Sequence, residues 1–203
     1  MNQVNYSVAK IVELVNDIYE YLICIDDIYL ASFLADWPTR PFKTRTVSPR
    51  SLPVLSYLPE LVTDGNGEIE RTIKMLESLK EQLPWGQTYS SEDFGATFLE
   101  KYGWTELVGL RGPIASEAIA CGFLLLGPEV EYPKHSHEAE EIYIPFNSQA
   151  LWAQGNDGWV SRPSGIPIYH GSWLTHGMRT ESRPLLALYL WRGGNLIQKS
   201  HID

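Results

Sequence analysis

The sequence predicts an α+β protein in which a helical N-terminal region, residues 1–104, packs on a C-terminal β-barrel, residues 105–203. Two observations support this prediction. In the first half, apolar residues recur at three- and four-residue spacings, as they do along the buried face of a helix. From residue 105 onward, short apolar runs alternate with Gly, Pro, Asn and Asp, which is typical of many short strands in a sandwich or barrel.

The helical half contains four candidate helices separated by turn signals. The stretch Asp36-Trp-Pro-Thr-Arg-Pro ends the second of them because proline does not fit a helix interior. A Gly-Asn-Gly turn precedes the third, and Ser90 is an N-cap signal before the fourth. The candidate helices are residues 4–25, 27–34, 68–83 and 92–102, with an irregular connection at residues 39–53.

The barrel half contains a series of candidate strands. The turn Asn156-Asp-Gly lies between Trp152 and Trp159 and is a strong signal for a β-hairpin. The helical half is too long for a linker, so we expect it to cover the barrel, to close its mouth, or to form a homodimer interface. The candidate strands are Glu106–Leu110, Ala118–Leu126, Glu141–Phe146, Ala150–Gln154, Gly158–Arg162, Ile166–Tyr169 and Leu185–Trp191.

Composition is ordinary for a globular protein and argues against two classes of partner. The formal net charge is -9 and no cluster of Lys and Arg appears, so the sequence predicts no nucleic-acid partner. We see no signal peptide and no apolar run long enough to span a bilayer. We therefore expect no membrane partner and a cytoplasmic location. Cys24 and Cys121 sit in apolar stretches and are predicted to be buried free thiols.

The stretch from Glu131 to Tyr143 carries a candidate metal site. His135 and His137 are two residues apart, so they share one face of a strand, and Glu141 and Tyr143 share a face of the next strand. A turn through residues 138–140 would let the two pairs meet inside the barrel. Imidazole and carboxylate ligands together suit Zn, Fe, Mn, Co or Ni better than Ca or Mg. The sequence therefore predicts one divalent transition-metal ion.

A more distant histidine is needed to complete such a site, and His170 and His176 compete for this place. His176 leads toward the last predicted strand, so we favour it. His170 precedes Gly171 in a turn and is expected at the surface. His201 lies in the C-terminal tail and is expected to be solvated.

The pattern Tyr132-Pro-x-His-x-His-x-Ala-x-Glu-x-Tyr143, followed by Trp173-x-x-His176 and Trp191, resembles the cupin-type dimethylsulfoniopropionate (DMSP) lyases of the Q type. The resemblance implies a cupin barrel of the double-stranded β-helix type. It also implies an enzyme that cleaves DMSP, a small sulfonium carboxylate, into dimethyl sulfide and acrylate. By position, it implies the metal ligands His137, Glu141, Tyr143 and His176 and the pocket residues Tyr132, His135, Trp173 and Trp191.

The implied reaction is a β-elimination, which needs a base, a Lewis acid and a site for a positive charge. A phenol near a metal or another cation can lose its proton, so Tyr132 or Tyr143 is the candidate base, with a slight preference for Tyr132. His135 is a ligand, a partner of the ligands, or an acid–base group. Aromatic faces suit the sulfonium, and the candidates are Trp191, Trp173 and Tyr132.

Two other classes of function remain open at this point. One is another metal-dependent cupin enzyme, such as an Fe(II) dioxygenase or a sugar isomerase. The other is a cupin that binds a small molecule without turning it over. Release of dimethyl sulfide, uptake of O2 and binding without turnover distinguish the three.

Overall fold

The computed structural model describes residues 2–148 and 150–202 of the chain. All four predicted helices are present, with ends shifted by at most four residues. A 3-10 helix follows the expected irregular connection at residues 39–53. Asp27 begins the second helix by accepting a hydrogen bond from the Leu30 amide at 2.8 Å, as an N-cap residue does. The helices are α1 Asn2–Leu22, α2 Ile28–Leu34, η1 Pro53–Glu60, α3 Gly67–Leu79, η2 Lys80–Gln82 and α4 Ser91–Glu100.

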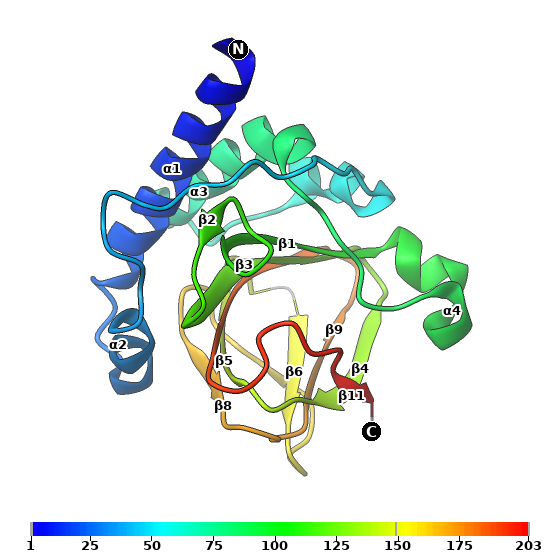
Figure 1. The fold of residues 1–203 in the computed structure, drawn as a ribbon. Coiled ribbons are helices and arrows are strands. Elements are labelled where there is room, and N and C mark those ends of the chain that lie inside the picture. The colour runs from blue at the N-terminus through cyan, green and yellow to red at the C-terminus, as the bar shows by residue number, and fades with distance from the viewer. Residues whose placement is uncertain (1, 149, 203) are drawn as a thin grey trace.

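The second half forms two sheets that face each other, and the predicted α+β fold class is confirmed (Figure 1). One sheet has the strand order β2-β1-β3-β10-β5-β8, and the other has the order β11-β4-β9-β6-β7. The strands are β1 Tyr102–Gly109, β2 Ile114–Ala115, β3 Ile119–Leu126, β4 Glu131–Ser136, β5 Glu140–Pro145, β6 Ala150–Gln154, β7 Val160–Ser161, β8 Ile168–His170, β9 His176–Thr180, β10 Leu185–Arg192 and β11 His201–Ile202.

The predicted hairpin is confirmed, while four strands were not among the candidates. β6 and β7 pair in antiparallel fashion, with Trp152 opposite Val160. The strands that were not predicted are the two-residue strands β2 and β11, together with β4 and β9. β4 and β9 lack long apolar runs because one of their faces carries polar side chains, among them His135 and His176.

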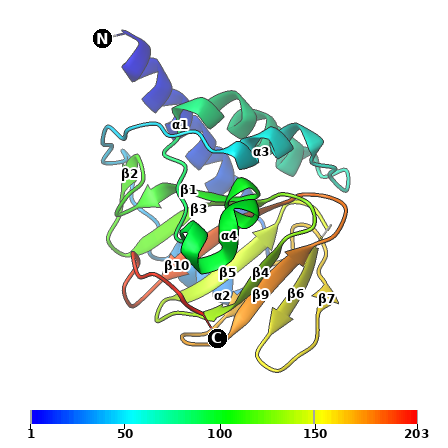
Figure 2. The same ribbon diagram turned by 90° about the vertical axis from the view of Figure 1, so that its right-hand side faces the viewer.

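The N-terminal helices pack on the outer face of the six-stranded sheet (Figures 1 and 2). Strand β10 is apolar from Leu185 to Leu190, apart from the Tyr189 hydroxyl, because both of its faces are covered there. Leu186, Leu188 and Leu190 belong to the cluster that contains the buried residues of α1 and α3. Ala187 and Tyr189 point the other way, into the cluster between the two sheets. Helix packing on one face therefore leaves the opposite face of the sheet free to line an interior.

Cys24 was expected to be buried, and this expectation is wrong. It lies exposed in the turn that follows α1, whereas Cys121 is buried in β3, and both thiols are free. Among the helices of the described residues, none combines the length and the apolar character needed to cross a bilayer.

Gly122 provides a test of the close contact between β1 and β3. A Cβ atom at this position would lie 1.9 Å from the Thr105 carbonyl oxygen. We therefore expect Gly122→Ala to lower the free energy of unfolding by at least about 1–3 kcal/mol, because a well-packed sheet must shift to admit the methyl group. Urea denaturation followed by circular dichroism measures this change.

Gly158→Ala is the matched control, since a Cβ atom there meets nothing within 4 Å. It should change the free energy of unfolding by less than about 0.5 kcal/mol. Equal midpoints for the two variants would contradict the close approach of the strands.

Candidate metal centre

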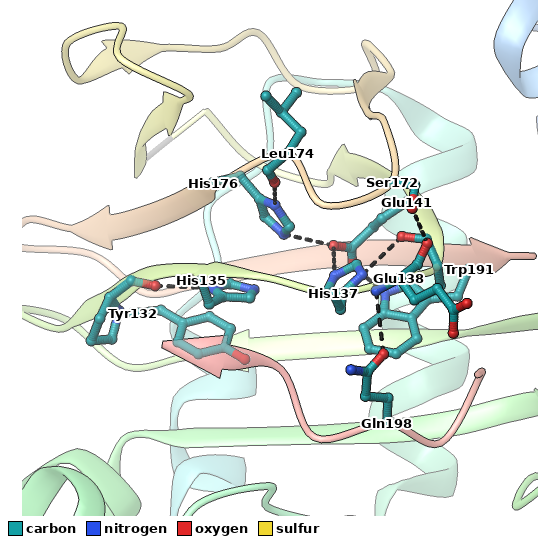
Figure 3. A network of polar contacts seen from close by, with 12 residues as sticks. Tyr132, His135, His137, Glu138, Glu141, Ser172, Leu174, His176, Trp191 and Gln198 are labelled. Carbon is teal, nitrogen blue, oxygen red and sulfur yellow. Dashed lines mark hydrogen bonds and ion pairs between the residues drawn. The ribbon is translucent and has the colours of Figure 1, made fainter. Parts of the chain in front are cut away.

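Four buried side chains converge between the two sheets. The possible ligand atoms of His135, His137, Glu141 and His176 all lie within 4.8 Å of one another. Figure 3 shows the three imidazoles arranged around the Glu141 carboxylate. His135 lies in β4 and His137 directly after it, Glu141 lies in β5, and His176 is the first residue of β9.

Strand register explains why residues so distant in sequence meet here. β4 and β9 are antiparallel, and His135 lies directly opposite His176. Opposite residues in an antiparallel pair point to the same face. The turn between β4 and β5 then returns the chain so that Glu141 approaches His137, with 3.0 Å between Nε2 and Oε2. The sequence-based expectation that His137, Glu141 and His176 come together agrees with this geometry.

The three imidazoles share one pattern of hydrogen bonding. In each, Nδ1 lies 2.8 or 2.9 Å from a backbone carbonyl oxygen two residues away, in Pro133, Ala139 and Leu174. A carbonyl oxygen only accepts hydrogen bonds, so each Nδ1 carries the hydrogen. The neutral ring then has its lone pair on Nε2, which is the form that binds a metal.

Two of these Nε2 atoms face a carboxylate rather than a donor. Nε2 of His137 and Nε2 of His176 lie 3.0 and 2.8 Å from the same oxygen, Oε2 of Glu141. Acceptor groups this close in a buried space require a positive charge between them, from protons or from a metal ion. The donor set of imidazole nitrogens and a carboxylate oxygen fits a divalent transition-metal ion.

The surroundings keep these groups in the required charge states. Burial, and then the neighbouring His176, lower the pKa of His135 to about 3, so this ring is neutral at pH 7. Burial opposes ionisation of Glu141, but the hydrogen bonds and charges of His137 and His176 outweigh it and hold the pKa of that carboxyl well below its usual range. A neutral ring and an ionised carboxylate are both ready to act as ligands.

Trp191 fixes the second oxygen of the same carboxylate. Its Nε1–H donates to Oε1 of Glu141 at 2.6 Å. Its rings also lie against His137, with 4.1 Å between centroids. Both contacts follow from the pairing of β10 with β5, which places Trp191 directly opposite Glu141. Trp191 therefore orients a candidate ligand as well as lining the interior.

Two buried tyrosines flank the cluster. Tyr132 stacks on His135 with 4.4 Å between ring centroids, and its hydroxyl lies 3.2 Å from that of Tyr89. Tyr143 follows Glu141 by two residues on the same face of β5 and lines the same cavity as Glu141. Burial is the main cause that raises the pKa of both phenols well above the usual value. Both are therefore protonated at pH 7 in the absence of a nearby cation.

A cavity of about 270 Å³ opens beside the cluster. Glu141, Tyr132, Tyr143 and Trp191 line it, so the candidate metal centre has access to a space of small-molecule size. One side of the cavity is lined by the segment Leu196–Ser200, which lies between β10 and β11.

Two residues lie elsewhere than the sequence suggested. His170 was expected at the surface, which is wrong: it is 1% exposed, and its ring stacks on that of His176 with 4.2 Å between centroids. The reason is that β8 pairs with β5 and places His170 opposite Glu141 on the inner face. Trp173 is 54% exposed and is not among the residues that line the cavity.

Several cavity residues were missed by the sequence reasoning. Tyr189 precedes Trp191 by two residues, so strand alternation from Trp191 would have identified it. Trp104 and Arg111 come from β1 and the turn after it, where no motif points to a site.

Comparisons with known proteins identify relatives. A family model described as dimethylsulfoniopropionate lyase matches residues 34–187. Among curated proteins, the chain is 34% identical to the dimethylsulfoniopropionate lyase DddQ of Ruegeria pomeroyi over 109 residues, which are 54% of each chain. It is 32% identical to the putative dimethylsulfoniopropionate lyase DddL of Cereibacter sphaeroides over 148 residues, which are 71% of this chain and 61% of that protein. The matches thus span between about half and three fifths of these curated relatives.

Solved structures show the same fold over nearly the whole chain. The crystal structure of DddQ from Ruegeria pomeroyi matches with a TM-score of 0.84 at 23% identity and covers 96% of both chains. A structure from a study of the lyases RdDddP and RnDddQII matches with a TM-score of 0.85 at 24% identity, covering 99% of this chain and 100% of that one. At these identities the likeness concerns the fold.

The hydrogen bond from Trp191 to Glu141 should contribute to metal affinity. Trp191→Phe keeps an aromatic ring beside His137 but removes the donor to Oε1. We expect the affinity for a divalent transition metal to fall about 10- to 100-fold, as for the loss of other groups that orient metal ligands. Competition with a chromophoric chelator measures this affinity.

Trp159→Phe is the control, because this indole lies against Arg179 with 4.9 Å to the guanidinium carbon and does not line the cavity. Its affinity should equal that of the unsubstituted protein. An unchanged affinity in Trp191→Phe would show that the indole does not organise the carboxylate.

Proposed function

This chain belongs to the dimethylsulfoniopropionate lyase family, and on that premise we propose that it is a metal-dependent carbon–sulfur lyase that cleaves DMSP into dimethyl sulfide and acrylate. The observation that carries the proposal is the set of imidazole Nε2 atoms gathered around the buried Glu141 carboxylate, beside a cavity with aromatic walls. The substrate is a small zwitterion with a carboxylate at one end and a sulfonium at the other, which suits a cavity of this size.

We propose that His137, Glu141, Tyr143 and His176 hold the ion, and that His135 completes or supports this set. The inclusion of His135 rests on its position opposite His176 and on its neutral ring. The ion would act as a Lewis acid toward the substrate carboxylate, which stabilises the negative charge that develops on it. The donor set accepts Zn, Fe, Mn, Co or Ni, so the native metal is to be identified by elemental analysis.

We propose Tyr132 as the base. In the reaction, a proton passes from the carbon next to the carboxylate to the phenolate oxygen of Tyr132. The C–S bond then breaks, its electron pair leaves with dimethyl sulfide, and the new double bond gives acrylate. Tyr132 lines the cavity and hydrogen-bonds to Tyr89, so its oxygen is held in a defined position. Because burial raises the pKa of this phenol, its activation requires a nearby positive charge.

The sulfonium has a fixed charge and no hydrogen to donate, so aromatic faces are its natural site. Tyr132 and Trp191 both line the cavity and are proposed for this role, together with Tyr102 and Tyr189, which lie on the same walls. Trp173 does not reach the cavity and is left out of the proposal.

Other expectations from the sequence stay predictions. These are the division at residue 104, the cytoplasmic location and the homodimer. The helices that were considered for a dimer interface use their apolar faces against the barrel: Leu14 and Ile18 of α1 share a cluster with Phe123 of β3.

Release of dimethyl sulfide gives the direct test of the activity. Purified protein mixed with DMSP should release dimethyl sulfide into the headspace, as measured by gas chromatography. Treatment with a chelator should abolish the release, and addition of the native ion should restore it. No release with any of the five ions, together with O2 uptake on another substrate, would support a dioxygenase instead. Ligand binding without turnover would support a binding protein.

The two tyrosines can be separated by single substitutions at equal metal content. We expect Tyr132→Phe to lower kcat about 10²- to 10⁴-fold, which is typical for loss of a general base, with metal content unchanged. We expect Tyr143→Phe to lower metal affinity first. Tyr29→Phe serves as the control, since Tyr29 stacks on Tyr169 and does not line the cavity. Near-full activity of Tyr132→Phe would assign the base to Tyr143.

A further inference from the structure

His170 is a buried histidine whose two ring nitrogens have no hydrogen-bond partner among residues 2–148 and 150–202. Its side chain is 1% exposed and does not line the cavity. A buried polar group without a partner destabilises a fold, so its presence needs an explanation. Because the nitrogen atoms make no hydrogen bond to the described residues, the flat aromatic ring is the feature that this position supplies.

Strand β8 brings this ring next to the candidate metal centre. His170 lies directly opposite Glu141 on β5, so both side chains lie on the inner face. Its ring stacks on that of His176, with 4.2 Å between centroids and 20° between the ring planes. The ring of Tyr143 lies 6.1 Å away in an edge-on arrangement. His170 therefore borders three of the four proposed metal ligands.

The position of His170 is fixed from the outer side of β8. Side chains alternate along a strand, so the preceding residue, Tyr169, packs outside against the cluster that contains the N-terminal helices. Its ring stacks on that of Tyr29 in α2 with 4.1 Å between centroids, and its hydroxyl donates to Oε1 of Glu140 at 2.5 Å. Its carbonyl oxygen accepts a hydrogen bond from the Gln154 side chain at 2.6 Å. These contacts hold the short strand, and His170 with it.

His176 needs such a support because its other contacts do not fix the plane of its ring. Its Nδ1–H group donates to the Leu174 carbonyl oxygen at 2.8 Å, and its Nε2 faces Glu141. Both contacts are made at the edge of the ring, and the torsion that turns an imidazole about its Cβ–Cγ bond is soft. His135 also lies against His176, with 4.3 Å between centroids, but it is tilted by 58° and offers no parallel face. The parallel ring of His170 restricts this rotation.

We propose that His170 is a positioning residue whose ring lies flat against His176 and fixes the plane in which Nε2 of His176 meets the metal ion. This inference rests on the proposed function, because it takes His176 as a ligand. Groups that orient a ligating histidine contribute to the affinity for the metal. Burial, and then the neighbouring His176, lower the pKa of His170 well below its usual value, so this ring adds no second positive charge beside the ion.

A role for the nitrogen atoms of His170 predicts a different outcome on substitution. If a nitrogen bound the ion or a water molecule, a side chain without nitrogen could not replace it. If the flat face is what matters, phenylalanine retains the function, whereas leucine fills the space without a plane. Asparagine retains polar atoms but has no ring. The three substitutions therefore separate a role of the ring from a role of its nitrogens.

Binding of Co²⁺ to the full-length protein tests the proposal, with the affinity measured by competition with a chromophoric chelator. We expect His170→Leu and His170→Asn to weaken binding about tenfold or more, as for the loss of other groups that orient metal ligands. We expect His170→Phe to stay within about twofold of the unsubstituted protein, because the stacked ring is retained.

The visible absorption of bound Co²⁺ supplies a readout that a general loss of stability would not move. The ligand-field bands depend on the number and the geometry of the ligands. At saturating Co²⁺, His170→Phe should keep the bands of the unsubstituted protein. His170→Leu should change them, because the ring of His176 is then free to turn. Unchanged bands in His170→Leu would overturn the proposed role.

His201→Leu is the matched control, since His201 is exposed in β11 and does not line the cavity. It should bind Co²⁺ with the affinity and the absorption bands of the unsubstituted protein. Urea unfolding of each metal-free variant shows whether the fold is retained. Should the larger ring of phenylalanine prevent folding, the comparison of His170→Asn with the unsubstituted protein carries the test.

Equal weakening by His170→Phe and His170→Leu would overturn the inference, because it would assign the effect to the nitrogen atoms. An unchanged affinity of His170→Leu or of His170→Asn would overturn it as well. Absence of dimethyl sulfide release together with the expected effects on Co²⁺ binding would refute the proposed lyase activity alone. Release of dimethyl sulfide without an effect of His170 would refute this inference alone. Failure of the unsubstituted protein to bind Co²⁺ would refute both.

Discussion

The buried carboxylate of Glu141 is the constraint on which the rest of the site depends. An ionised carboxylate enclosed by protein is costly unless it is neutralised and hydrogen-bonded. Here one oxygen faces two imidazoles and the other accepts from the Trp191 indole. All three rings around it direct their Nδ1–H groups to the backbone, which turns their Nε2 atoms inward. The arrangement is complete only when a positive charge occupies the centre.

Meeting this constraint fixes the register of several strands. Glu141 must lie opposite Trp191 on β10, and His176 must lie opposite His135 on β4. A slip of one residue would turn each of these side chains to the other face of its sheet. The apolar outer face makes such a slip costly, because Leu186, Leu188 and Leu190 are buried against the N-terminal helices. The helical half thus contributes to the site at a distance, by holding the register of the sheet behind it.

The sequence allowed much of this to be predicted, and the failures have physical causes. His137 and Glu141 were found because alternation within a strand and a short turn are local features, whereas His176 was favoured for its place before the last predicted strand and by the family resemblance. His170 was misplaced because β8 has only three residues, which is too short to show a period of two. Arg111 was not found because its position depends on the bulge between β1 and β3 and on contacts with Arg45, which are distant in sequence. The exposure of Trp173 depends on a loop conformation with φ of 60°, which no local pattern indicates.

The inner face of the sheet contains two buried carboxylates, Glu106 and Glu141, and the chain neutralises them in different ways. Glu106 is paired with a guanidinium and two backbone amides, all of which belong to the protein. Arginine keeps its charge at every relevant pH, so this pair is permanent and serves to hold a turn. Glu141 instead faces the Nε2 atoms of His137 and His176, so protons on these rings or a metal ion can supply the positive charge. A metal ion bound at such a position would keep its affinity for further ligands. A catalytic centre needs this property, whereas a structural ion pair does not. The difference between arginine and histidine at these two positions therefore separates the part of the sheet that supports the cavity from the part that we propose to bind the metal ion.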